Sequence, residues 1–285
     1  MRLIRFRSQA EGAYKLGMET GGNVCDLSSR FMTVRQFFEA YPDGWNDTSL
    51  DLASLPASPR SDVHLGPPVD DGAGVYLVGA NYRKHAEEAG LDVPEIPVIF
   101  MKPTTALVGP GEPICLPPIS KQMDYEGELA VVIGRAATRV SKADAPKHVA
   151  GLTIVNDVTA RDLQWVQLGK HRIVDWISSK ALDRSTPVGP GIVSLQAAGD
   201  MHRLKLKTWL NADLMQDGDT SLMVFSVFDL IEFLSARLTL RPGDIISTGT
   251  PFGVGGFRKI FLKQGDVLRV EVDTVGMLQN PVVDA

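Results

Sequence analysis

The sequence has few cysteines. Cys25 and Cys115 are the only two among 285 residues, and neither belongs to a CxxC pair or lies near a histidine cluster. They predict neither a disulfide framework nor a zinc site, and they favour a reducing cytoplasm as the location of the protein. We interpret both as small buried apolar side chains.

The sequence also lacks an excess of one charge and a long apolar run. It has 29 Lys and Arg against 34 Asp and Glu, for a formal net charge of -5. This mixture excludes the electrostatic footprint of a nucleic-acid or anionic-membrane partner. The N-terminus alternates charged and apolar residues, which predicts a first strand and no secretory signal. The most apolar later stretch, residues 222–234, contains two acids and is too short to cross a bilayer, so we expect a soluble protein.

What is present is enough apolar sequence for a sizeable core, at 44 % apolar and 22 % charged residues. Short β-like runs separated by Pro and Gly follow Gly74, at residues 75–78, 97–100, 128–133, 153–155, 204–210, 244–247 and 267–272. This spacing predicts a mainly β fold with some α, of the α+β class. Residues 1–70 predict a small N-terminal α/β subdomain, with strands at 3–6 and 24–27 and a helix at 34–41, and residues 71–285 form the main domain.

Two capping boxes predict helices. The segment Ser141-Lys-Ala-Asp144 opens a helix over residues 145–150, which we expect to end at Gly151. The segment Ser226-Val-Phe-Asp229 opens a second helix that ends near Arg237.

Two acids, Glu126 and Glu128, stand two residues apart on a predicted strand. Their carboxylates therefore point to one face, about 6 to 7 Å apart along the chain. A solvated sheet face is the alternative interpretation. The apolar continuation at 130–133 instead indicates a strand buried on both sides, and two sheltered carboxylates repel each other unless a cation lies between them.

Asp157 offers a third carboxylate, directly after a short apolar strand. Three oxygen ligands without convergent Cys or His predict a hard cation, Mg²⁺ or Mn²⁺ rather than Zn²⁺, with Ca²⁺ as an alternative. The other interpretation of Asp157 is a cap of the turn or helix at residues 158–164.

Six segments in order carry a resemblance: VGANYRKH at 78–85, FMKPTTA at 100–106, DYEGE at 124–128, NDVTARD at 156–162, KALD at 180–183 and TGTP at 248–251. Over roughly residues 74–278 the chain resembles the fumarylacetoacetate hydrolase superfamily. The resemblance implies a mixed β-sandwich roll around a central site, with residues 71–285 as the catalytic domain, a homodimer, and a divalent ion held by Glu126, Glu128 and Asp157. Val78 stands where the namesake enzyme has a further metal-binding Asp, as in the shorter three-carboxylate members.

His85 and Glu88 are the candidates for proton transfer. Their i to i+3 spacing puts them on one face of a helix, where the carboxylate can orient the imidazole. An ordinary surface ion pair is the alternative from spacing alone. The resemblance favours the catalytic role, because it implies a segment here that folds into a short helix over the bound substrate.

The resemblance also implies two substrate contacts and one further catalytic group, and a turn offers two more candidate contacts. Lys180 is either a solvated lysine or a cation that faces the metal site, and the resemblance favours the second. Arg161 and Gln164 match positions that contact substrate in the family. The turn with Gly249 and Thr250 offers an N–H and a hydroxyl to a carboxylate, and a turn without a ligand is its alternative.

These roles predict a Mg²⁺- or Mn²⁺-dependent hydrolase that cleaves a carbon-carbon bond of a β-diketo acid, of the acylpyruvate, fumarylpyruvate or diketo-deoxy sugar acid type. The ion and Lys180 would stabilise the enolate of a chelated 2-oxo acid, and His85 would deprotonate the attacking water. The same enolate arises in an oxaloacetate decarboxylase or a 2-hydroxy-dienoate isomerase, which are alternatives on the same site. A metal-dependent phosphoester hydrolase and a non-catalytic descendant of the fold are alternatives of other classes.

Overall fold

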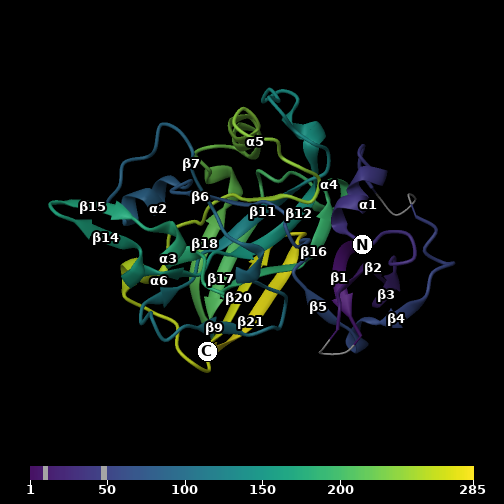
Figure 1. Cartoon of the computed structure of the whole chain (residues 1–285), viewed down its shortest axis with the longest axis horizontal. Helices are drawn as coiled ribbons and strands as arrows, with labels where there is room; N and C mark the ends of the chain where they lie inside the picture. Colours follow the sequence, from purple (N-terminus) through teal and green to yellow (C-terminus); the bar gives the residue numbers. More distant parts are fainter. Residues whose placement is uncertain (9–11, 46–49) are drawn as a thin grey trace.

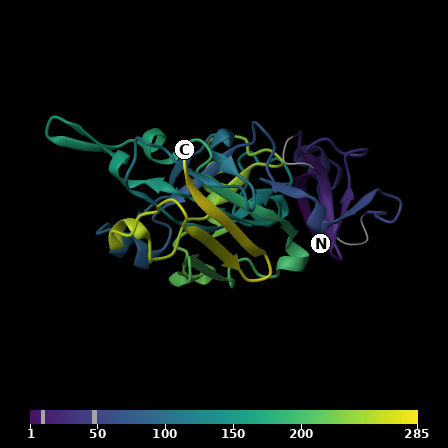
Figure 2. The ribbon, with the colours of Figure 1, turned by 90° about the horizontal axis from the view of Figure 1, so that it is seen from below.

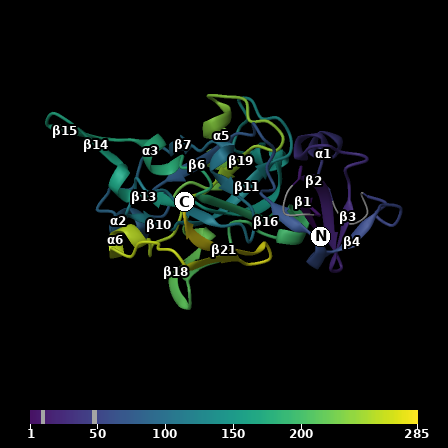
Figure 3. The same cartoon turned by 60° about the horizontal axis from the view of Figure 1, so that its bottom comes forward.

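Two β-sheets dominate the computed structural model, which describes residues 1–8, 12–45 and 50–285 (Figure 1). The larger sheet contains β1 (Arg2–Arg7), β2 (Lys15–Thr20), β3 (Asn23–Asp26), β4 (Ala57–Pro59), β5 (His64–Gly66), β6 (Val75–Gly79), β7 (Val98–Met101), β8 (Leu107–Val108), β11 (Gly127–Ile133), β12 (Val149–Asn156), β16 (Thr186–Ser194) and β19 (Ile245–Ser247). The smaller sheet contains β9 (Ile114–Leu116), β17 (Lys205–Leu210), β18 (Asp213–Asp219), β20 (Val267–Val272) and β21 (Gly276–Asp284). In Figure 3, β18 and β21 lie below β11 and β16.

Short elements complete the structure. Two strand pairs stand outside the main sheets, β10 (Met123–Asp124) with β13 (Thr159–Ala160), and β14 (Trp165–Leu168) with β15 (His171–Val174). The helices are α1 (Val34–Ala40), α2 (Arg83–Glu88), α3 (Trp176–Lys180), α4 (Leu195–Ala198), α5 (Val227–Ser235) and α6 (Gly255–Arg258). The 3-10 turns are Arg60–Asp62, Thr104–Ala106, Ala145–His148, Arg161–Leu163 and Thr220–Leu222. This sheet-dominated architecture confirms the predicted α+β class.

The N-terminal strands extend the large sheet, whose main path runs β4-β3-β2-β1-β16-β12-β11-β19-β6-β7. The connection is the antiparallel pairing of β1 with β16, which places Leu3 opposite Ile192. These N-terminal strands lie at the right of Figure 1. The division of the chain at residue 70 stays a prediction.

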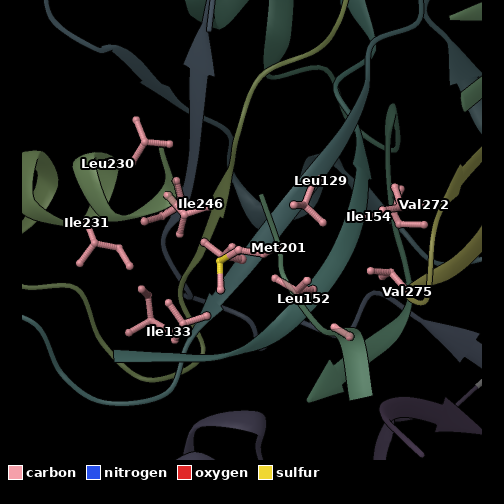
Figure 4. Close-up of a cluster of buried hydrophobic side chains, with 14 of the residues drawn as sticks. Leu129, Ile133, Leu152, Ile154, Met201, Leu230, Ile231, Ile246, Val272 and Val275 are labelled. Atoms are coloured by element: carbon pink, nitrogen blue, oxygen red, sulfur yellow. The ribbon is translucent and has the colours of Figure 1, made fainter. Parts of the chain in front are cut away.

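The central strand β11 is buried on both faces. Leu129, Val131 and Ile133 belong to a buried apolar cluster that includes side chains of β12, β20 and α5 (Figure 4). The alternate residues Ala130 and Val132 belong to a second cluster, which includes the aromatic side chains of α1. The expectation of a strand sheltered on both sides is confirmed, and the acids near its start, Glu126 and Glu128, are buried.

The structure confirms one predicted helix and corrects the other. The helix that Ser226 opens is α5, and both hydrogen bonds of its capping box with Asp229 are present. The helix expected over residues 145–150 is wrong, because a single 3-10 turn ends at His148 and β12 begins at Val149. Pairing with β11 on one side and β16 on the other satisfies the backbone groups of β12, so the sheet prevails over the local helix signal.

The structure also bears on the expectations for the two cysteines and for membrane-spanning helices. Both cysteines are free, and Cys25 is buried as expected, whereas Cys115 is only half-buried. Within the described ranges, no helix is long and apolar enough to cross a membrane.

Candidate metal centre and active site

Two of the predicted ligands lie at the start of β11. Glu126 directly precedes the strand and Glu128 is its second residue, so the strand begins one residue later than the paired acids suggested. Gly127 between them faces the other way, where a Cβ atom would lie 2.2 Å from Oγ1 of Thr208. Only glycine fits there, and both carboxylates are directed to the same buried face.

The third predicted ligand, Asp157, directly follows β12 and lies beside Glu126. Antiparallel pairing of β11 with β12 sets this position, since Gly127 is opposite Asn156. The backbone N–H of Asp157 donates to the carbonyl oxygen of Glu126 at 2.8 Å. One carboxylate oxygen from each of Glu126, Glu128 and Asp157 lies within 4.8 Å of the others, and all three residues are buried.

Basic side chains pair with two of these three acids. Nζ of Lys180 lies 2.6 Å from Oε2 of Glu126 and 2.5 Å from Oδ2 of Asp157. Nζ of Lys102 lies 2.7 Å from Oδ1 of Asp157, and Arg161 forms an ion pair with Oε1 of Glu126. Burial alone would raise the pKa of Glu126, but the charges of Arg161 and Lys180 outweigh it and hold that pKa below its ordinary value.

Glu128 differs from the other two acids. It forms no ion pair with the Lys, Arg or His side chains that the structure describes, and Oε2 accepts hydrogen bonds from Oγ of Ser247 at 2.5 Å and from the N–H of Gly249 at 3.0 Å. Burial raises the pKa of Glu128 well above its ordinary value, and the negative charges of Asp157 and Glu126 raise it further. A cation beside Glu128 would offset the free-energy cost of keeping this buried carboxylate charged.

The backbone conformation of the predicted turn requires glycine at position 249. The φ of Gly249 is +89°, and a Cβ atom would lie 2.9 Å from the carbonyl oxygen of Val78. Only glycine satisfies both conditions, and the turn then directs its N–H at Glu128. This N–H, which we expected to meet a substrate carboxylate, therefore bonds a predicted metal ligand in the structure.

The site has more acidic than basic groups, which favours the binding of a cation. Four buried carboxylates stand against three buried or nearly buried cations: Asp124, Glu126, Glu128 and Asp157 against Lys102, Arg161 and Lys180. One negative charge is left without a partner, and the three clustered donors are all oxygen. Such a set suits Mg²⁺, Mn²⁺ or Ca²⁺, and the residues therefore fit the predicted ion.

Sequence reasoning assigned no role to Lys102 and Asp124. Nε of Arg161 donates to both carboxylate oxygens of Asp124 at 3.0 Å, and the N–H of Gly256 donates to Oδ2 at 2.5 Å. Burial raises the pKa of Asp124 to about 6, although the charge of Arg161 opposes the shift. The signal for both residues was their place inside the FMKPTTA and DYEGE segments.

A cavity of about 430 Å³ opens beside the three acids. Its lining includes eight of the ten predicted site residues: His85, Glu126, Glu128, Asp157, Arg161, Gln164, Lys180 and Thr250. Aromatic side chains form much of the remaining wall, namely Phe100, Trp165, Trp176 and Phe257. The rings of Phe100 and Trp176 are stacked with centroids 4.5 Å apart. The other two predicted residues do not line the cavity: Glu88 lies beside His85, and Gly249 donates its N–H to Glu128.

His85 and Glu88 share one face of α2, as predicted. Nδ1 of His85 lies 3.9 Å from Oε2 of Glu88, and that oxygen also accepts the N–H of Gly253 at 2.9 Å. Burial would raise the pKa of Glu88, but the His85 side chain and the N–H groups of Gly253 and Val254 lower it below its ordinary value. A charged Glu88 therefore stands beside the imidazole.

Three predicted substrate contacts, Arg161, Gln164 and Thr250, line the cavity while bonded to protein groups. Arg161 begins a 3-10 turn, and its Nη1 donates to Oε1 of Gln164 at 3.3 Å. The Thr250 hydroxyl donates to the carbonyl oxygen of Gly127 at 2.8 Å and accepts from Nε2 of Gln216 at 2.7 Å. Their contact with a substrate stays a prediction.

The fold and this carboxylate cluster agree with one protein family. The model of the family "Fumarylacetoacetate (FAA) hydrolase C-terminal" matches residues 74–283. The chain belongs to the fumarylacetoacetate hydrolase superfamily, a group of enzymes, as the resemblance implied.

Individual relatives differ in the reaction that their names give. The chain is 40% identical over 292 residues to the human "Oxaloacetate tautomerase FAHD2A, mitochondrial", with 99% of this chain and 92% of that protein covered. It is similar to a 5-carboxymethyl-2-hydroxymuconate delta-isomerase from Mycobacterium smegmatis, at TM-score 0.77 and 36% identity, covering 100% and 99% of the two chains. It is also similar to maleylpyruvate hydrolase from Sphingobium sp. SYK-6 in complex with manganese(II) ion and pyruvate, at TM-score 0.80 and 29% identity, covering 100% of both chains.

Proposed function

We propose that this chain is a Mg²⁺- or Mn²⁺-dependent oxaloacetate tautomerase. The observation that carries the proposal is a buried cluster of three carboxylates that opens into the cavity lined by His85 and Lys180. The identity of 40% with an oxaloacetate tautomerase, over almost the whole of both chains, supports this reaction. The sequence alone favoured a carbon-carbon hydrolase, with other enolate reactions as alternatives.

Tautomerisation requires little of the protein beyond proton transfer. One proton leaves C3 of the keto form and one is delivered to the oxygen on C2, while the C2–C3 bond becomes double and the C2–O bond single. No carbon-carbon bond is broken and no co-reactant is consumed. A bound Mg²⁺ or Mn²⁺ would supply a Lewis acid for the oxygens of a 2-oxo acid. Glu126, Glu128 and Asp157 would hold that ion.

The protein's own side chains would then stabilise the enolate and transfer the proton. The ammonium group of Lys180 lies at the carboxylate cluster and lines the cavity, where it would stabilise negative charge on the enolate oxygen. His85 would move the proton at C3, and Glu88 at 3.9 Å from Nδ1 would act as a positioning residue for the imidazole. The aromatic wall of the cavity would limit the access of water.

The test follows the enol and keto forms of oxaloacetate directly. Enol oxaloacetate is mixed with the Mn²⁺-loaded protein, and the decay of enol ultraviolet absorbance is recorded while pyruvate is assayed in parallel. We expect faster decay without pyruvate formation, and loss of the acceleration after exhaustive chelation. Pyruvate release at the rate of enol loss would identify a decarboxylase, and no acceleration with either metal would reject the proposal.

Hydrolysis of a β-diketo acid is the second candidate. The likeness to maleylpyruvate hydrolase with manganese and pyruvate favours it, as does a cavity that extends from the acids to Trp165 and Trp176. The discriminating assay supplies maleylpyruvate, fumarylpyruvate and other acylpyruvates to the same protein and measures pyruvate and the second acid. Turnover of one of these well above that of oxaloacetate would make the hydrolase the main activity.

The homodimer and the cytoplasmic location stay predictions. The name of the human relative places that protein in mitochondria, and nothing in its name concerns assembly. Sedimentation of the purified protein would test the dimer.

A further inference from the structure

One basic side chain in the cavity has no acidic partner. Four basic residues line the cavity: His85, Arg161, Arg172 and Lys180. Three of them contact acids described above, Glu88 for the histidine and the carboxylate cluster for the other two. In the part of the chain that the structure describes, Arg172 has no carboxylate within ion-pair distance. Its charge is therefore available to a ligand.

The hairpin of β14 and β15 places Arg172 at the cavity. This hairpin pairs with no other strand among the described residues and projects from the molecule at the left of Figure 1 and of Figure 2. Trp165 is paired with Val174, and Gln167 with Arg172, so these four side chains share one face of the ribbon. Trp165, Arg172 and Val174 all line the cavity.

The opposite face of the hairpin has a different character. Val166 and Ile173 alternate with the cavity residues, do not line the cavity, and are 38% and 47% exposed. The ribbon is therefore two-sided, and its charged and aromatic side is the one directed at the site. Turning Arg172 away would require a shift of one residue in the register of the hairpin.

Arg172 is held in place by stacking, which leaves its donors free. Its Cζ atom lies 4.5 Å from the ring centroid of Trp165. A guanidinium group has five N–H donors in one plane, and a stacked arginine can still bind a carboxylate through its edge. Such bidentate pairing is the geometry that arginine supplies and lysine does not.

The base of the hairpin is joined to the element that carries Lys180. The N–H of Asp175 donates to the carbonyl oxygen of Gln164 at 2.9 Å, which closes the base of the hairpin. The Asp175 side chain in turn accepts the N–H of Ser178 at 3.0 Å and caps α3, whose last residue is Lys180. Arg172 and the carboxylate cluster are thus linked by a short, hydrogen-bonded segment.

We propose that Arg172 binds a second carboxylate of the substrate, so that the site selects 2-oxo dicarboxylic acids over 2-oxo monocarboxylic acids. The proposal rests on the proposed function, because the 2-oxo acid group would lie at the predicted metal ligands and leave the far end of the substrate for the hairpin. Arg172 is then a specificity-determining residue outside the metal centre.

The test compares two ligands of equal chain length, 2-oxoglutarate and 2-oxopentanoate, which differ in the second carboxylate. Calorimetry measures the Kd of each with the Mn²⁺-loaded protein. We expect the diacid to bind about tenfold more tightly, since a hydrogen bond to a charged group at an exposed site is worth about this factor. Arg172→Gln should remove the difference by weakening only the diacid, and Arg172→Lys should restore part of it.

Lys170→Gln is the matched control, because it removes a positive charge from the same hairpin at a residue that does not line the cavity. It should leave the preference for the diacid intact. Equal affinities of the wild-type protein for both ligands, or no binding of either, would overturn the proposal. An equal loss for both ligands in Arg172→Gln, or the same loss of preference in Lys170→Gln, would also overturn it.

Turnover separates this proposal from the proposed function. Oxaloacetate and its 4-methyl ester differ in the same charge, and kcat/KM is measured for both. We expect Arg172→Gln to lower kcat/KM for oxaloacetate about tenfold through KM and to leave the ester unchanged. A wild-type protein that prefers 2-oxoglutarate but does not accelerate enol decay would reject the tautomerase and keep the carboxylate site.

Discussion

Nζ of Lys180 lies 2.5 Å from Oδ2 of Asp157, in a site where both side chains are almost completely buried. Burial would lower the pKa of Lys180, but the charges of Asp157 and Glu126 raise it above its ordinary value. The lysine therefore stays charged and offsets part of the repulsion among the acids. An ion held by the same acids would compete with this ammonium group for their oxygens, so lysine and metal oppose each other electrostatically.

Replacement of Lys180 should therefore separate metal binding from turnover. Lys180→Met leaves buried acids without their partner, which costs about 3–5 kcal/mol of folding free energy in comparable sites. A divalent ion compensates for that loss, so the rise in Tm on addition of Mn²⁺ should be larger in the variant than in the wild type. Activity on oxaloacetate should nevertheless fall, because the charge proposed to stabilise the enolate would be gone.

Lys205→Met is the control for this experiment, since Lys205 is exposed and pairs with Asp219 at a surface site. It should change the stability little, because exposed ion pairs contribute little to folding, and it should leave the effect of Mn²⁺ on Tm unchanged. If Mn²⁺ raised Tm less in Lys180→Met than in the wild type, Lys180 and the metal ion would not compete for the same carboxylates.

Glu128→Gln should have the opposite effect on metal binding. Its carboxylate has no basic partner among the described residues, and its pKa is raised. A neutral amide of the same shape should therefore leave the metal-free protein as stable as the wild type or more stable. Mn²⁺ affinity should fall by at least about 100-fold, because even indirect partners of metal ligands change affinity by 10- to 100-fold. Titration calorimetry checks this result, with Glu271→Gln at a half-buried residue outside the site as control. Undiminished affinity would remove Glu128 from the ligand set.

The sequence predicted the carboxylate cluster because its signals are local. Glu126 and Glu128 follow the period of a strand, and the apolar residues after them indicate burial. Asp157 follows the next strand of the antiparallel pair, so the register of β11 and β12 turns two local patterns into one site. The family resemblance supplied the remaining roles.

What the sequence did not reveal depends on contacts between distant segments. Lys102 reaches Asp157 across the interior, and no local pattern distinguishes a buried lysine from a solvated one. The expected helix over residues 145–150 failed for a related reason, because its capping signal is local while the pairing of β12 is not. The hairpin with Arg172 likewise becomes informative only when the cavity beside it is known.

His85→Gln tests the proton-transfer role. Loss of a positioned general base typically lowers the rate by about 10²- to 10⁴-fold, so kcat on oxaloacetate should fall within this range. Among the described residues, His85 forms its ion pair with Glu88 and none with the three clustered carboxylates, so Mn²⁺ affinity should stay within about threefold of the wild type. His202→Gln, at a half-buried histidine that packs on Phe228, should leave kcat unchanged. Full turnover in His85→Gln would show that another group moves the proton.

Glu88→Gln tests how the imidazole is positioned, and its effect should depend on pH in one direction. The pKa of Glu88 lies below its ordinary value of 4.5, so the carboxylate is charged across the neutral range and gains a proton only in acid. The ratio of wild-type to variant kcat should therefore be constant, at about tenfold, between about pH 6 and pH 8. Only below pH 4.5, as the pH falls through the lowered pKa of Glu88, does the wild-type carboxyl group become neutral like the amide, and the ratio should then approach one.

The pH profile distinguishes this role from a purely structural one. A structural role through the N–H of Gly253 would be shown by a lower Tm in Glu88→Gln and a rate ratio that stays the same in acid. A positioning role requires the ratio to shrink as Glu88 is protonated, because it is the negative charge of Glu88, 3.9 Å from Nδ1, that orients the imidazole. A ratio that grows as the pH falls would contradict both the sign of the pKa shift and the function assigned to this pair.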